Sequence, residues 1–290
     1  MQKLAGVGVA LVTPFNEDLS VDFDSLTKLV EFNIEQGTNY LVVLGTTAET
    51  ATLTAEEKEQ VIQHIIKVNQ QRLPMVLGIG GNNTVEVVKQ IENTDTSAFE
   101  AILSSSPYYN KPNQEGIYQH YKALTQTGKN IILYNVPSRT GQNVEAATTL
   151  RLANEFPNLI MIKEASPNIN QYFDILRKKP ENFNLVSGDD EFALAVTLAG
   201  ANGVISVIGQ AYPKLFSQMI KLGREGNAKE AYKIQNKMVE ITRLIFAEGN
   251  PTGIKYVLSE MGLIKNHLRL PLVKASDDLA QKIKTEMAKI

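Results

Sequence analysis

Residues 131–135, Ile131-Ile-Leu-Tyr-Asn135, and residues 159–163, Leu159-Ile-Met-Ile-Lys163, are short apolar runs that each end in a polar side chain. Such near-continuous hydrophobicity is typical of strands covered on both faces, as in a parallel sheet. Six similar runs occur elsewhere, and the starts of all eight are separated by 34, 34, 27, 30, 28, 25 and 19 residues. The six are Gly6–Val12, Tyr40–Leu44, Pro74–Ile79, Ala101–Ser105, Asn184–Ser187 and Gly203–Val207. Most of these separations match the length of one strand-helix unit.

Most gaps between the runs hold segments of helical periodicity. One is Asp22–Gln36, and another is Thr54–Gln71, which opens with the capping box Thr54-Ala-Glu-Glu57. Eight alternations predict a closed (β/α)8 TIM barrel in the α/β class, because closure at eight strands removes both sheet edges and fills the interior with side chains. An open α/β sheet with a miscounted strand is the alternative.

The strand signal ends after Val207. Pro213–Leu222 predicts the eighth barrel helix, and Asn227–Ala247, Thr252–Met261 and Ser276–Ala288 predict three more. We therefore expect a catalytic barrel over residues 1–224 and an appended C-terminal three-helix module over residues 225–290. Because no low-complexity linker separates the two, the module is expected to pack on the barrel.

The composition excludes several classes of protein. The 290 residues are 43% hydrophobic and 21% charged, with a formal charge of −2, so neither disorder nor a nucleic-acid-binding surface is indicated. The absence of cysteine excludes disulfides, thiolate metal sites and a cysteine nucleophile. The first fifteen residues are unlike a signal peptide or a spanning helix, so we expect a cytoplasmic protein with no nucleic-acid or membrane partner.

Reactive groups in such barrels gather at the carboxyl ends of the strands. Four motifs fall there: Gly45-Thr-Thr-Ala-Glu49, Pro107-Tyr-Tyr-Asn-Lys-Pro112, Tyr134-Asn-Val-Pro-Ser-Arg-Thr-Gly141 and Lys163-Glu-Ala-Ser166. Hydroxyls, phenols, an arginine and a lysine are therefore expected to converge on one rim. None of these motifs contains a histidine or a carboxylate cluster that would hold a catalytic metal, so no metal site is expected.

Lys163 is the most informative single residue. The apolar strand Leu159–Ile162 should deliver its amine into a partly dry environment that disfavours charge. An uncharged lysine attacks carbonyl groups and forms a Schiff base. Lys111 and Lys255 are rival amines, but no apolar strand holds either of them. A lysine that extends to solvent, or one paired with Glu164, is the structural alternative.

Schiff-base chemistry also needs proton transfer. Tyr134, one strand-helix unit before Lys163, is expected to pass protons through a chain of hydroxyls with Thr46 and Tyr109, because hydroxyl groups both donate and accept hydrogen bonds. Arg139, in a predicted tight turn, is expected either to bind a substrate carboxylate or to stabilise that turn.

Two other motifs have structural interpretations. Gly78-Ile-Gly-Gly81 lacks the lysine of a phosphate-binding loop, so it predicts a close-packed turn after a strand. Asp189-Asp190-Glu191 predicts a helix start more strongly than a cation site, because acidic side chains offset the helix dipole there.

The four rim motifs, with Ser187-Gly-Asp-Asp190 and Gly203-Val-Ile-Ser-Val207, resemble those of the dihydrodipicolinate synthase family in the N-acetylneuraminate lyase superfamily. The resemblance extends almost from end to end. It implies condensation of pyruvate with L-aspartate 4-semialdehyde to 4-hydroxy-tetrahydrodipicolinate, in the diaminopimelate and lysine pathway. It also implies a homotetramer, a dimer of dimers, and no cofactor beyond the covalent imine on the protein.

The resemblance also implies roles for individual residues. Lys163 matches the lysine that forms the imine, Tyr134 the tyrosine that relays protons, and Thr46 the threonine that links two phenols. Tyr109 matches a phenol inserted from a neighbouring subunit. Three further residues match substrate-binding positions: Thr47 and Ile205 at the pyruvate site, and Arg139 at the carboxylate of the aldehyde.

Two residues depart from the family pattern. Ala48 replaces the usual glycine, so either its backbone does not need a positive φ or it carries strain. Lys58 stands where members inhibited by lysine often have histidine, although Asn82, Glu86 and Tyr108 match the inhibitor site. Because Lys58 would repel a cationic effector, we expect weak inhibition by lysine.

Two alternative functions also fit these motifs. A lyase for N-acetylneuraminate or a 2-keto-3-deoxy sugar acid would keep the same first half-reaction with a different aldehyde. A non-catalytic member of the fold would bind a keto acid as a sensor or act as a subunit of a larger assembly.

Overall fold

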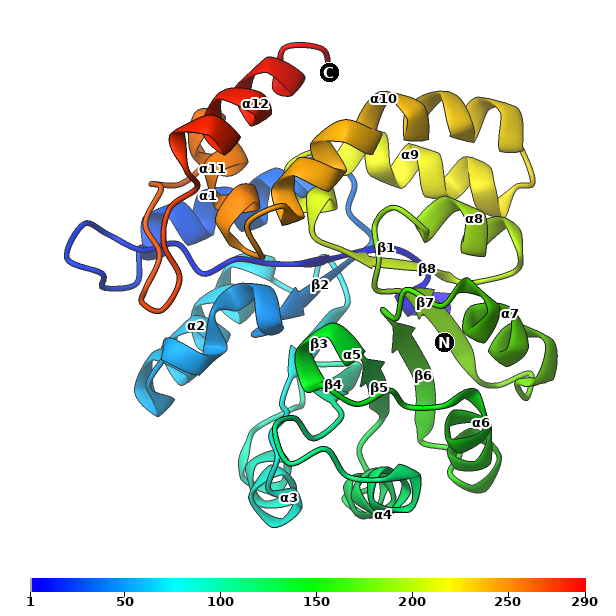
Figure 1. Cartoon of the computed structure of the whole chain (residues 1–290). Coiled ribbons are helices and arrows are strands. Elements are labelled where there is room, and N and C mark those ends of the chain that lie inside the picture. The colour runs from blue at the N-terminus through cyan, green and yellow to red at the C-terminus, as the bar shows by residue number, and fades with distance from the viewer. Residues whose placement is uncertain (1) are drawn as a thin grey trace.

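The computed structural model describes residues 2–290, and Met1, the first residue of the predicted barrel domain, lies outside the described residues. Eight parallel strands form a closed barrel in chain order (Figure 1). They are β1 (Gly6–Ala10), β2 (Tyr40–Val43), β3 (Met75–Gly78), β4 (Ala101–Ser105), β5 (Ile131–Asn135), β6 (Leu159–Glu164), β7 (Asn184–Ser187) and β8 (Gly203–Ser206). Because β8 pairs with β1, the predicted (β/α)8 barrel is confirmed and the open sheet is excluded.

Helices surround the barrel. They are α1 (Phe23–Glu35), α2 (Ala55–Asn69), α3 (Thr84–Asn93), α4 (Gln114–Thr125), α5 (Pro137–Thr140), α6 (Ala146–Glu155), α7 (Ile169–Lys178), α8 (Ala193–Leu198) and α9 (Pro213–Arg224). The capping box is confirmed, since the Thr54 hydroxyl accepts from the backbone of Glu57 and the Glu57 carboxylate accepts from the backbone of Thr54. A short α8 explains why the last two strands start only 19 residues apart. One helical turn, α5, stands where a tight turn was predicted.

Large side chains fill the interior of the barrel. Tyr40 is fully buried there and packs against Gly8, where an added Cβ would lie 2.1 Å from the Tyr40 ring. Ile132, Met161 and Val186 belong to the same inner cluster, which is distinct from the larger apolar layer between strands and helices. The packed interior leaves the carboxyl ends of the strands as the place where polar side chains meet.

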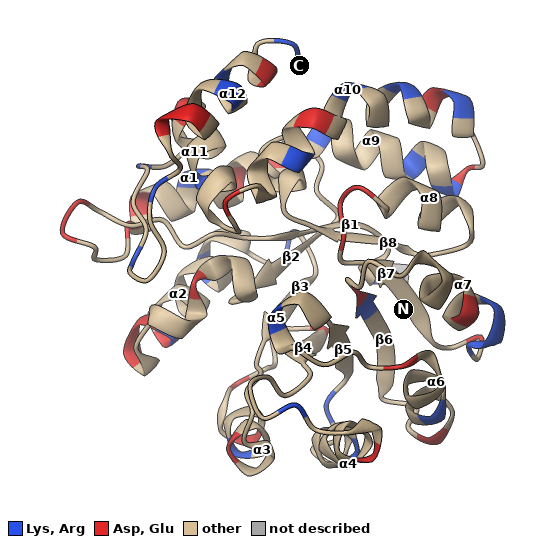
Figure 2. Ribbon diagram, viewed as in Figure 1, with Lys and Arg blue, Asp and Glu red and all other residues tan. Residues whose placement is uncertain are grey.

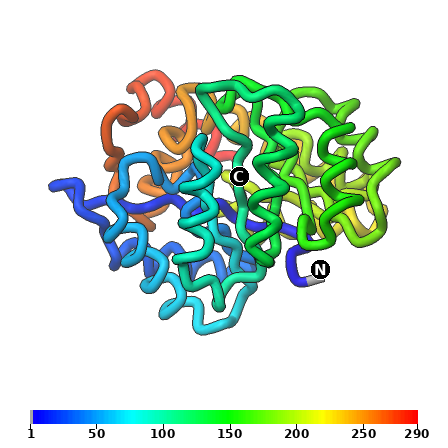
Figure 3. Tube along the Cα trace, turned by 90° about the horizontal axis from the view of Figure 1, so that it is seen from below, coloured from blue at the N-terminus to red at the C-terminus, as the bar shows by residue number. Residues whose placement is uncertain are grey.

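Three helices follow the barrel: α10 (Ala228–Phe246), α11 (Thr252–Glu260) and α12 (Asp277–Met287). They pack on one another, and α10 also packs on α8 and α9. Figures 1 and 3 show the orange and red segments together on one side of the barrel, close to the blue N-terminal segments. α9 ends at Arg224, so the predicted boundary falls between α9 and α10. The division into two domains stays a prediction.

Charges of both signs are interspersed along the outer helices (Figure 2). Within residues 2–290, no helix is both long and apolar enough to cross a membrane. Across the same residues, no group of three or more His, Asp and Glu side chains is placed to hold a metal ion.

Candidate active site

The register of β5 against β6 brings the two central residues together. Tyr134 pairs with Lys163 across the strands, and the Lys163 Nζ lies 4.2 Å from the centroid of the Tyr134 ring. Both side chains project inward, because Ile132 and Met161, two residues earlier on each strand, belong to the inner cluster. Lys163 is 5% exposed and Tyr134 is 7% exposed. An amine and a phenol thus meet at the carboxyl end of the barrel.

A polar clamp on the outer face of the same strands holds this register. The Asn135 amide donates to both Glu164 carboxylate oxygens, at 2.9 and 3.0 Å, and Gln171 donates to one of them at 2.7 Å. Burial raises the pKa of Glu164, although these donors and the Ser166 backbone act in the opposite direction. Because Asn135 and Glu164 directly follow Tyr134 and Lys163, this contact fixes the pair on the inner face.

Gly188, just after β7, leaves room for the lysine. A Cβ added to Gly188 would lie 3.0 Å from the Cε of Lys163 and 2.7 Å from the Cβ of Ala165. A larger residue there would displace the amine.

The Thr46–Ala48 segment forms one turn of 3-10 helix, η2, after β2. Thr47 is buried, and its hydroxyl accepts a hydrogen bond of 2.9 Å from the Asn250 amide, so its own proton is free to donate to a ligand. Ala48 needs no positive φ, whereas the flanking Leu44 and Glu49 have φ of 54° and 55°. The departure from glycine at position 48 is therefore accommodated without strain at that residue.

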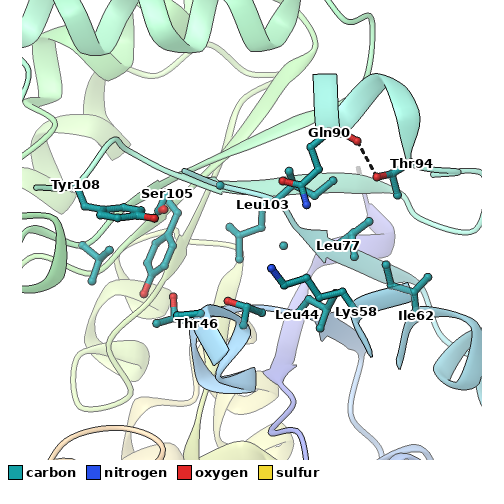
Figure 4. A pocket seen from close by; sticks show the side chains of 18 of the residues that line it. Leu44, Thr46, Lys58, Ile62, Leu77, Gln90, Thr94, Leu103, Ser105 and Tyr108 are labelled. Atoms are coloured by element: carbon teal, nitrogen blue, oxygen red, sulfur yellow. Dashed lines mark hydrogen bonds between the residues drawn. The ribbon is translucent and has the colours of Figure 1, made fainter. Parts of the chain in front are cut away.

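A cavity of about 590 Å³ opens at this rim. Thr46, Tyr134 and Arg139 line one part of it, and Lys58 and Tyr108 also line it. Figure 4 shows the Lys58 side chain extending from α2 into the cavity, whose other part is lined by Thr46 and Tyr108. The cavity therefore extends from Tyr134 to the space between α2 and α3.

The structure does not bring every predicted residue to the cavity. Lys163, Thr47 and Ile205 are buried close to the rim and do not line it, while Tyr109 is 88% exposed and lies outside it. Arg139 reaches the cavity from α5 and donates a hydrogen bond of 3.3 Å to the carbonyl of Asn250.

Comparison with known proteins identifies the family. Residues 3–290 match the model of the Dihydrodipicolinate synthetase family. The chain belongs to this family. A 4-hydroxy-tetrahydrodipicolinate synthase of Flavobacterium psychrophilum is 51% identical over 98% of this chain and 97% of its own length. Another synthase with this name, from Parabacteroides distasonis, is 53% identical over 93% of this chain and 92% of its own.

Solved structures agree with this assignment. A dihydrodipicolinate synthase from Acinetobacter baumannii, complexed with pyruvate, has a TM-score of 0.95 and 39% identity, covering 99% of this chain and 98% of its own. The family and the enzyme class expected from the sequence are confirmed.

The interpretations of the glycine-rich and acidic motifs also hold. An added Cβ at Gly78 would lie 2.2 Å from the carbonyl oxygen of Leu44, so the turn is close-packed as predicted. Asp189 accepts hydrogen bonds from the backbone of Glu191 and Phe192, directly before α8, which is the predicted helix start.

Sequence reasoning missed two features of this family member. Asn250, which contacts both Thr47 and Arg139, lies far from either in sequence and belongs to no rim motif. No strand holds Lys255 or Lys111, as expected, but Lys255 is fully buried in α11, which the sequence reasoning did not anticipate, whereas Lys111 is exposed. The flanking Ile254, Val257 and Leu258 are the signal for that burial.

Asp190 holds the segment that follows β8. Its Oδ2 accepts hydrogen bonds of 3.0 Å from the backbone of both Val207 and Ile208, two and three residues after Ile205. Burial raises the pKa of Asp190 from 3.8 to about 6, because these donors offset only part of the desolvation. The unfolded chain therefore loses this proton at lower pH than the folded protein.

This shift predicts a pH-dependent stability. Between pH 3.8 and about 6 the folded state binds more protons at Asp190 than the unfolded state does, so its contribution to the free energy of unfolding falls as pH rises. In Asp190→Asn that contribution is removed. Urea unfolding of both proteins should show the wild type losing stability relative to the variant across this window, by up to about 3 kcal/mol. If the free energies of unfolding of the two proteins change with pH in the same way, the pKa of Asp190 is not raised and this prediction is wrong.

Proposed function

We propose that this enzyme condenses pyruvate with L-aspartate 4-semialdehyde to 4-hydroxy-tetrahydrodipicolinate through a Schiff base on Lys163, in the diaminopimelate and lysine pathway. The observation that carries the proposal is the buried Lys163 amine, 4.2 Å from the centroid of the Tyr134 ring at the catalytic end of a (β/α)8 barrel. The names of the relatives and the pyruvate complex of the Acinetobacter baumannii enzyme support the choice of substrates.

In the first step, the uncharged Lys163 amine adds to the C2 carbonyl carbon of pyruvate and gives a carbinolamine. Loss of water then gives the imine. A site that excludes solvent favours the loss of water. The covalent bond to Lys163 supplies the electron sink, so no further cofactor is proposed.

The next steps move protons. Removal of a proton from the methyl group of the imine gives an enamine, whose terminal carbon attacks the carbonyl carbon of the aldehyde and forms the new carbon–carbon bond. The amino group of the second substrate then attacks the imine carbon, which closes the ring and releases Lys163. Tyr134 is the proposed proton carrier, because its phenol is adjacent to the lysine, and Thr46 and Tyr109 continue the chain of hydroxyls.

Three residues are proposed to bind the substrates. Thr47 donates its free hydroxyl proton to the carboxylate of pyruvate, beside the apolar wall of Ile205. Arg139 binds the carboxylate of the aldehyde, since the single hydrogen bond to the Asn250 carbonyl leaves most of its guanidinium donors available.

We propose that Tyr109 acts in a neighbouring subunit. Its side chain is 88% exposed and its backbone has a φ of 73°, a costly conformation for a non-glycine residue. Insertion of this phenol into the site of a partner, within a homotetramer that is a dimer of dimers, would give it a function that it lacks in one chain. The cytoplasmic location also stays a prediction.

Reductive trapping tests the imine. Borohydride added with pyruvate should reduce the imine to a stable secondary amine, so that peptide mass analysis finds the adduct on Lys163. Lys163→Arg should give no adduct there. Reversible binding of pyruvate by the wild type without any adduct would contradict the proposal and support the sensor alternative.

Arg139→Ala separates the two possible aldehydes. For the synthase, we expect kcat/KM for aspartate semialdehyde to fall by about 10²-fold, the cost of losing a charge-assisted bidentate contact, while trapping of pyruvate on Lys163 stays unchanged. A coupled assay measures the first quantity, and N-acetylneuraminate serves as the comparison substrate. Preferred turnover of the sugar acid, together with a small effect of the substitution, would instead favour the lyase.

Lys58 predicts weak inhibition by lysine. Its ammonium lies in the cavity and would repel a cationic effector, although Tyr108 also lines this space. Synthase activity should therefore fall little as lysine is added, and Lys58→His should increase the sensitivity. Half-inhibition of the wild type at low lysine concentration would defeat this expectation.

A further inference from the structure

A buried ion pair joins the C-terminal module to the threonine turn. Lys255 of α11 and Glu49, the residue that follows η2, form a salt bridge in which neither side chain is exposed to solvent. Neither residue takes part in the proposed chemistry. Burying two charges is costly, so such a pair is stable only where further hydrogen bonds satisfy both groups.

Contacts from several segments enclose the pair. The Lys255 Nζ donates to the carbonyl of His267 at 2.9 Å and lies 4.1 Å from the centroid of the Phe15 ring. The other carboxylate oxygen of Glu49 accepts from the backbone of Arg269 at 3.1 Å. Burial lowers the pKa of Lys255 to about 8, against the opposing effect of Glu49, so the amine stays largely protonated at neutral pH.

Glu49 is also the residue that ends the threonine turn. Its φ of 55° and ψ of 36° are left-handed, and its backbone N–H donates to the carbonyl of Thr46. A non-glycine residue stays in this conformation only when its surroundings fix it. Besides the local backbone bonds and the Thr13 hydroxyl on the Ala48 carbonyl, the contacts that hold Glu49 are those of its side chain. These side-chain contacts, with Lys255 and the backbone of Arg269, come from the C-terminal part of the chain.

We propose that Lys255 and Glu49 are positioning residues, which hold the turn so that the Thr47 hydroxyl faces the carboxylate of pyruvate. The inference rests on the proposed function, because it assigns that carboxylate to Thr47. A second contact also joins the module to the turn: the Asn250 amide donates to the Thr47 hydroxyl. Asn250 comes directly before Pro251, which precedes α11. The C-terminal module thus contributes to substrate binding without touching the substrate.

The contacts of Lys255 also exclude it as the imine-forming amine. It is fully enclosed, and its ammonium donates to a carboxylate and a carbonyl. A carbonyl substrate cannot reach it without loss of both contacts. Burial alone therefore does not make a lysine a nucleophile, since an adjacent carboxylate keeps it protonated.

The test compares three variants with the wild type. Lys255→Met removes the cation with little change in length, Glu49→Gln removes the anion, and the double variant removes both charges and leaves no unpaired buried charge. Lys265→Met is the matched control. Lys265 lies in the same C-terminal segment, but its side chain is 56% exposed, and its ammonium pairs with Asp22 at 3.2 Å and donates to Asn16 at 2.8 Å.

The readout is the pyruvate concentration that gives half-maximal borohydride trapping, with thermal unfolding measured in parallel. A displaced turn should raise this concentration by about 10-fold to 10²-fold in Lys255→Met and in the double variant, while saturating pyruvate still labels Lys163. Lys265→Met should match the wild type. If Lys255→Met does not fold, Glu49→Gln and the double variant decide the outcome.

Three results would overturn the inference. The first is a folded double variant with the half-saturation of the wild type, because the pair would then only stabilise the fold. The second is an equal shift in Lys265→Met, which would indicate general loosening of the segment. The third is an adduct on Lys255 itself. Absence of any adduct in the wild type would instead refute the proposed function, so the two failures are distinguishable.

Discussion

The pairing of β5 with β6 sets Tyr134 beside Lys163, and the proposed chemistry depends on that register. A slip of β6 by one residue against β5 would turn Lys163 to the outer face, where Glu164 now bonds with Asn135, and would separate it from Tyr134. The closed barrel makes such a slip costly, because all eight strands share one hydrogen-bonded ladder. Met161 and its neighbours in the inner cluster pack beneath the pair, and the Lys163 side chain is buried.

The proposed binding residues are positioned by more distant parts of the chain. The threonine turn follows β2, yet several of the contacts that hold it come from residues 250–269. The Thr13 hydroxyl, near the end of β1, also donates to the carbonyl of Ala48 at 2.8 Å. The amide of Asn250 donates to Thr47, and its backbone carbonyl accepts from Arg139. Asn250 therefore contacts both residues proposed to bind the substrate carboxylates. The C-terminal helices are therefore part of the site's architecture as well as of the fold.

Local sequence predicted the barrel, because each buried strand carries its signal in four to six consecutive residues. It also predicted that Lys163 and Tyr134 lie at one rim of the barrel, because the carboxyl ends of all eight strands meet there. It did not predict the burial of Lys255 or the contacts of Asn250, which arise from packing between segments about two hundred residues apart. The roles proposed for Thr47 and Ile205, and the insertion of Tyr109 from a neighbouring subunit, came from the resemblance alone and stay predictions.

The central claim is that Lys163 forms the covalent bond to pyruvate beside Tyr134. A crystal structure of the enzyme soaked with pyruvate tests it most directly. The account predicts continuous electron density from the Lys163 Nζ to C2 of the substrate, with the substrate carboxylate at the Thr47 hydroxyl. Density joined to another lysine, or pyruvate bound without a covalent bond and away from Tyr134, would contradict it.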